Sequence, residues 1–183
     1  MIGQPARLRA NRTRQIIRTV TYLPRLLVGL AAGAAGTTAL NAVTYLDMAI
    51  RGRGISSTPE DTVEAIATKT GQSIPGDKVT RKNRDSGLGA LTGILAGVGV
   101  GAMLGAAQAA GWRPQLITVA VATGAGAMLV TDAPMALPSV SDPRIWSVKD
   151  WVSDAVTHLA YGLVTATVVR SIRTHQGWNP TPA

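Results

Sequence analysis

Residues 88–111 constrain the fold most, because these 24 residues contain no charged side chain. As an α-helix the stretch would be about 36 Å long, enough to cross a hydrocarbon core of about 30 Å. Its glycines recur at every fourth position: Gly89, Gly93, Gly97, Gly101 and Gly105. In water, each glycine inside a helix costs roughly 1 kcal/mol relative to alanine, whereas in lipid such small residues let another helix backbone approach closely. The pattern predicts a transmembrane glycine zipper that packs against another helix of the chain or of a second copy, with Val100 off the packing strip.

Three further apolar stretches, 26–48, 115–132 and 151–170, predict the remaining spans. The expected fold is therefore all-α, an integral membrane bundle of four transmembrane helices over residues 26–173. With 183 residues, no second domain fits. Pro24 is expected to end a basic interfacial segment, 1–25, and residues 174–183 are expected to form a tail.

The polar connection 51–86 carries signals for one short amphipathic helix outside the membrane, at 59–70. Thr58 suits the N-cap of a helix, Pro59 its first turn and Asp61 its N3 position, and Gly71 suits its end. This helix is expected to rest on the membrane surface or on the ends of the spans. Residues 73–86 are expected to form a loop, and Asp132 and Pro134 to close the third span.

Charge suggests how the chain sits in the membrane. The formal net charge is +8, but the basic residues flank apolar spans and no nucleic-acid-binding motif accompanies them. We therefore expect no nucleic acid partner, and anionic lipid headgroups at the Arg-rich N-terminus. Lys and Arg are shared equally between the two sides, so the positive-inside rule does not decide. An acid-free cluster of six arginines before the first span predicts cytoplasmic termini in the plasma membrane.

The helical period also predicts which faces pack. In the first span, Gly29, Gly33 and Gly36 lie on one stripe with Asn41, which is expected to face protein. The third span offers Ala120, Gly124 and Met128 as a groove for the zipper. In the fourth span the polar residues share one face, and the opposite face is apolar and includes Leu159, Leu163 and Ala166.

Ionisable residues inside a span are costly and are by default a functional hypothesis. In an antiparallel bundle, His158 and Asn41 both lie about 10 Å below the surface nearest the 51–86 connection. This matching predicts a cluster of Asn41, Tyr45, Asp154 and His158. The wider candidate layer comprises Asn41, Tyr45, Asp47, Asp132, Asp154, His158 and Tyr161. The cluster would lock the first helix to the fourth, or would serve as a proton or cation site.

The common motifs of enzyme active sites are absent from the sequence. The chain has no cysteine, no G-x-S-x-G motif, no phosphate loop and no zinc-ligand spacing. Asp150, Asp154 and His158 share a helical face, but one helix supplies only part of a metal shell. We therefore expect no enzyme activity, cofactor or metal. Two function classes remain: a non-catalytic accessory subunit, scaffold or oligomer, packed on itself or another membrane protein, and a small transporter or channel. The almost wholly apolar cytoplasmic halves of the first and fourth spans favour the former.

Several short strings carry a resemblance to known sequences. They are Gly36-Thr37-Thr38-Ala39-Leu40-Asn41, Tyr45-Leu46-Asp47-Met48, Arg51-Gly52-Arg53 and Ser57-Thr58-Pro59-Glu60, with Trp151, Asp154 and residues 158–162 in the fourth span. Through them the chain resembles an uncharacterised family of small multi-pass membrane proteins from actinobacteria, over most of residues 28–170. The resemblance implies a membrane architecture and a type of host, and no catalytic residue.

Overall fold

The computed structural model describes residues 4–136 and 140–176. They form the helices α1 (Gln4–Arg51), α2 (Thr58–Lys69), α3 (Lys78–Ala109), α4 (Leu116–Ala136) and α5 (Val148–Gln176), with a short 3-10 helix η1 (Pro143–Ile145) and no strand in this part of the chain. Residues 22–51 of α1, the helices α3 and α4, and residues 148–172 of α5 are each long and apolar enough to cross a bilayer. The predicted all-α fold is confirmed, and its architecture is that of a multi-pass membrane protein.

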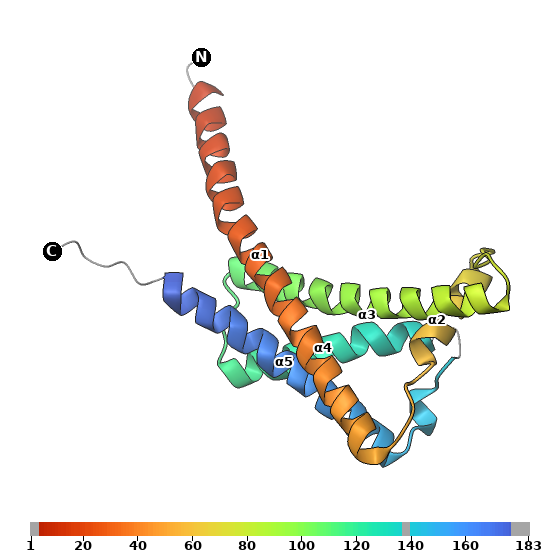
Figure 1. Ribbon diagram of the computed structural model, residues 1–183. Helices are drawn as coiled ribbons and strands as arrows, with labels where there is room; N and C mark the ends of the chain where they lie inside the picture. Colours follow the sequence, from red (N-terminus) through yellow and green to blue (C-terminus); the bar gives the residue numbers. More distant parts are fainter. Residues whose placement is uncertain (1–3, 137–139, 177–183) are drawn as a thin grey trace.

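Helix α1 is longer than the first predicted span. It runs without interruption through Pro24, so the prediction that this proline ends a separate N-terminal segment is wrong. A proline removes one backbone hydrogen bond, and a long helix keeps the bonds on either side of it. The first part of α1 consequently extends away from the other helices (Figure 1). Its binding to anionic headgroups stays a prediction.

Three other helix ends differ from the predicted ones. Helix α3 begins at Lys78, within the expected loop, because the carboxylate of Asp77 accepts a hydrogen bond of 2.8 Å from the backbone N–H of Thr80 and so caps the helix. Helix α4 continues through Pro134 to Ala136 and does not end at residue 132. Helix α5 continues past residue 170 to Gln176, and the rest of the expected tail lies outside the described residues.

The short helix in the polar connection lies close to its predicted place. Its N-cap residue is Ser57 and not Thr58, since the Ser57 carbonyl accepts the backbone N–H of Asp61 at 2.9 Å. Gly71 follows its end with a φ of +71°, a backbone conformation that favours glycine. Helix α2 packs mainly on the first part of α3 and also touches α4, as Figure 1 shows.

The spans pack in three main pairs: α1 crosses α3, α4 lies along α5, and α1 contacts α5 (Figure 1). We call the side on which residue 22, Ala109, Leu116 and residue 172 lie the terminus side, and the side of the connection 52–77 the loop side. Near the terminus side, apolar residues that are at most 5% exposed fill the interior: Ala32, Leu104, Val119, Ala120, Ala166 and Val169.

The polar face of α5 is buried and its apolar face is exposed, and the two faces contain the residues that the helical period predicts, with one exception. Thr157, His158, Tyr161 and Thr165 are buried, whereas Leu159 and Leu163 are exposed. Ala166 is an exception, because it was assigned to the apolar outer face and is instead buried in the core.

Glycines bring the α1 and α3 backbones into direct contact. A methyl group on Gly33 would lie 2.6 Å from the carbonyl oxygen of Gly97, and one on Gly105 would lie 3.2 Å from the Cα of Gly29. Gly36 instead faces the side chains of Tyr161 and Thr165 on α5. Small residues on both helices thus permit a close crossing.

The α3 glycines do not make one continuous contact. Gly89 packs against Pro59 of α2, and Gly93 has open space where a side chain would project. The expected groove of α4 also has a different partner: a methyl group on Gly162 of α5 would lie 2.7 Å from the backbone nitrogen of Gly124. The prediction that this groove receives α3 is wrong, because Gly162 gives α5 an equally small surface.

Candidate functional site

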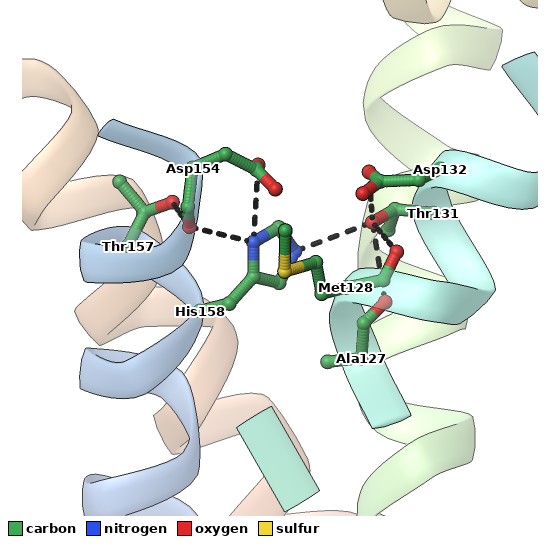
Figure 2. A network of polar contacts seen from close by, with 7 residues as sticks. All are labelled: Ala127, Met128, Thr131, Asp132, Asp154, Thr157 and His158. Carbon is green, nitrogen blue, oxygen red and sulfur yellow. Dashed lines mark hydrogen bonds and ion pairs between the residues drawn. The ribbon is translucent and has the colours of Figure 1, made fainter. Parts of the chain in front are cut away.

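The candidate site is centred on His158, which lies on the buried face of α5 and is 6% exposed. Its Nδ1 is 2.9 Å from the carbonyl oxygen of Asp154 and 3.1 Å from the carboxylate oxygen Oδ1 of the same residue. Its Nε2 is 3.2 Å from the hydroxyl of Thr131 on α4 (Figure 2). Because both neighbours of Nδ1 are acceptors, Nδ1 carries a proton and donates to Asp154.

The protonation of Nε2 depends on Thr131. This hydroxyl lies 3.1 Å from the carbonyl oxygen of Ala127 and 3.0 Å from that of Met128. When Thr131 donates to either carbonyl, its oxygen is free to accept a hydrogen bond from a protonated Nε2, and the ring is a doubly protonated imidazolium. When Thr131 donates to Nε2, the ring is neutral. One hydroxyl rotation therefore accompanies the gain or loss of a proton.

Two aspartates face each other across this histidine (Figure 2). Asp132 on α4 interacts electrostatically with both Asp154 and His158, and its Oδ1 lies 3.3 Å from the Thr131 hydroxyl. The Oδ2 atom of Asp154 is buried and has no hydrogen-bond partner among the residues that the structure describes. With a neutral ring the three groups carry two negative charges, and with an imidazolium they carry one. Because close like charges are costly in a low-dielectric interior, the site favours an added proton or cation.

The structure unites only part of the predicted polar layer. Asp132, Asp154 and His158 meet, and one turn further along α5 the hydroxyl of Tyr161 donates to the carbonyl of Gly97 at 2.6 Å. Asp47 lies apart and forms ion pairs with Arg51 at 3.3 Å and Arg53 at 2.6 Å.

Asn41 and Tyr45 are not joined to this site. Tyr45 is 57% exposed, and no hydrogen bond between either residue and His158 occurs in the part of the chain that the structure describes. The predicted cluster rested on matching depth in the membrane. Depth sets the level of a side chain but not the direction in which it points round the helix axis.

Thr131 is the residue that sequence reasoning missed. It lies seven residues after Gly124, which places both on one face of α4. At Gly124 the α4 backbone meets the α5 backbone at His158, where a methyl group on the glycine would lie 2.7 Å from the His158 carbonyl. The glycine contact therefore sets the register that brings Thr131 to the imidazole. The seven-residue spacing from Gly124 was the sequence signal that could have predicted Thr131 at this site.

Metal binding has no support in this geometry. Among residues 4–136 and 140–176, no three His, Cys, Asp or Glu side chains are grouped so that they could hold a metal ion. The site offers proton chemistry, because His is the side chain that ordinarily titrates near neutral pH.

Comparison with protein-family models, curated proteins and solved structures finds no match to this chain. The resemblance to actinobacterial membrane proteins thus stays an expectation from its residues.

Proposed function

We propose that this protein is a non-catalytic integral protein of the plasma membrane, with both termini in the cytoplasm, that acts as an accessory subunit or scaffold. One observation carries the proposal: an apolar cluster lies in the bundle between His158 and the surface on the terminus side. A pore or carrier path needs polar groups or water along its whole depth. Tyr161 and Thr165 are also buried in this half, and their hydroxyls donate to the backbone carbonyls of Gly97 and Tyr161. We therefore infer that the histidine site does not continue as a polar path to the terminus side.

A surface for a partner lies on the first half of α3. Beyond the crossing with α1, Gly93 has no atom of the described residues within 4 Å of where its side chain would project. Leu91, Ile94 and Leu95 beside it are exposed. Transmembrane helices associate through surfaces of this kind, because a glycine among apolar residues lets the two backbones approach closely. The occupant we propose is a helix of another membrane protein.

Co-purification tests this proposal. The full-length protein, expressed in its own host and extracted in a mild detergent, should retain a stable membrane protein that mass spectrometry identifies. Gly93→Leu should weaken that retention, whereas Gly126→Leu, a matched change at an equally open glycine of α4, should not. A lone monomer, a second copy of the chain as sole companion, or equal loss with both variants would contradict the partner proposed here.

A transporter or channel is the second candidate, and the paired aspartates around His158 favour it. In this alternative the site carries a proton or cation, and α4 and α5 must move to open the apolar half. Purified protein in liposomes, with a pH-sensitive dye inside, should show no more proton flux than empty liposomes if the subunit proposal holds. Flux that disappears in Asp154→Asn but persists in Asp142→Asn, an exposed carboxylate outside the spans, would replace the first proposal with the second.

A further inference from the structure

A groove of about 220 Å³ lies between the end of α1 and the start of α5, and its wall also contains Asp47, Ser153 and Thr157. Its walls include Arg51 and Lys149 at one end and Val43 and Val156 at the other. Val43 precedes Arg51 by eight residues and Val156 follows Lys149 by seven, so the valines lie about 10 to 12 Å deeper than the cations. Cationic and apolar groups are therefore separated along the membrane normal.

The cations stand where the membrane surface is expected, at the loop-side ends of two spans. Arg51 and Lys149 both act electrostatically on Asp150, which places cations of different helices around one carboxylate. Asp150 is itself engaged with Ser147, whose hydroxyl lies 2.6 Å from its Oδ2. The ammonium of Lys149 has no hydrogen bond or ion pair within the described ranges.

The charged side chains around the mouth of the groove have a net positive charge that one anion can balance. Asp47 is shared by Arg51 and Arg53, and Asp150 faces Lys149. Three cations against two carboxylates leave a net charge of about +1 around the mouth of the groove, the complement of a single phosphodiester. The groove is also open towards the bilayer, since Val156 is 49% exposed.

We propose that this groove binds an anionic phospholipid of the leaflet on the loop side. The phosphate lies beside Arg51 and Lys149, and the first carbons of an acyl chain lie along Val43, Val152 and Val156. A water-soluble anion would use the two cations but would gain nothing from the valines, whereas a lipid uses both. This inference goes beyond the accessory-subunit role and does not depend on it.

Native mass spectrometry of the full-length protein provides the test, with phosphatidylglycerol and phosphatidylcholine of identical chains as probes. The wild-type protein should retain phosphatidylglycerol in preference to phosphatidylcholine. Arg51→Gln with Lys149→Gln should lower that preference by roughly fivefold per cation. Arg81→Gln with Lys82→Gln removes the same charge from the exposed start of α3 and should leave the preference unchanged. Equal loss in both double variants, or no loss in either, would overturn the proposal.

A second variant keeps the test independent of charge and folding. Val156→Trp fills the groove from its bilayer side and should reduce retention of both lipids, with thermal unfolding in detergent checking that the bundle is intact. Short-chain phosphatidylglycerol should displace the bound lipid, whereas millimolar inorganic phosphate should not. Displacement by phosphate to the same extent, or full retention by Val156→Trp, would refute the apolar part of the site and with it the lipid.

Discussion

The crossing of α1 and α3 offers a matched pair of glycine substitutions. A methyl group on Gly101 would lie 2.5 Å from the Cα of Gly33 and 2.6 Å from its backbone nitrogen. A methyl group on Gly99, two residues earlier on the same helix, would meet no atom within 4 Å in the described part of the chain. Gly101→Ala and Gly99→Ala thus make the same chemical change with and without a neighbouring backbone.

The expected magnitude follows from these distances. Carbon atoms pack favourably at about 3.5–4.0 Å, so Gly101→Ala must push the two helices apart by about 1 Å. Such overpacking typically costs about 1–3 kcal/mol. Both variants gain about 1 kcal/mol of helix propensity, which cancels in the comparison. At about 2–4 °C per kcal/mol for a chain of this size, Gly101→Ala should unfold about 2–12 °C below Gly99→Ala.

Thermal unfolding in a mild detergent, followed by the loss of the monodisperse peak in size-exclusion chromatography, measures this difference. Equal midpoints for the two variants would refute the argument that direct backbone contact holds α1 to α3. Val100→Leu is unsuitable as a control, although the glycine spacing places this residue off the packing strip. Val100 is 7% exposed and packs with Ala127 and Tyr161, so added bulk there would also strain the core.

Three further predictions concern topology, packing and pH. A single cysteine at Ser73 should react with an impermeant maleimide in intact cells and one at Arg113 should not, and the same answer at both positions would contradict their placement on opposite sides. Tyr161→Phe should cost about 1 kcal/mol, or about 2–4 °C in thermal unfolding, because it removes a buried hydrogen bond to the α3 backbone; an unchanged midpoint would argue against that bond. Hydrogen bonds from Arg144 lower the pKa of Asp142. The small stabilisation that these bonds give the folded protein is therefore present above the ordinary pKa of 3.8 and is lost as pH falls through the lowered pKa. In an NMR titration, Arg144→Gln should therefore raise the pKa of Asp142 towards 3.8. An unchanged pKa of Asp142 would show that the ion pair is absent in solution.

Local sequence properties determined the number of spans and the polar face of α5. Span length and apolar composition decide membrane crossing one helix at a time, because each helix satisfies its own backbone hydrogen bonds. The helical period likewise places Thr157, His158 and Tyr161 on one face without reference to any neighbour. Helix ends were less well determined, as Pro24 and Pro134 show, because a proline removes a single bond and the surrounding helix decides whether it continues.

The tertiary structure decided which faces meet. Spacing identified small residues on the first three spans, but small surfaces are interchangeable, and only packing assigned Gly124 to α5 and left Gly93 open. The histidine site shows the same limit. The sequence placed Asp132, Asp154 and His158 in one polar layer and matched His158 by depth to Asn41. The register of α4 on α5 added Thr131 and brought Asp132 to the histidine. A sequence period defines the direction of a side chain within its own helix, and the rotation of one helix relative to another depends on the packing of the whole bundle.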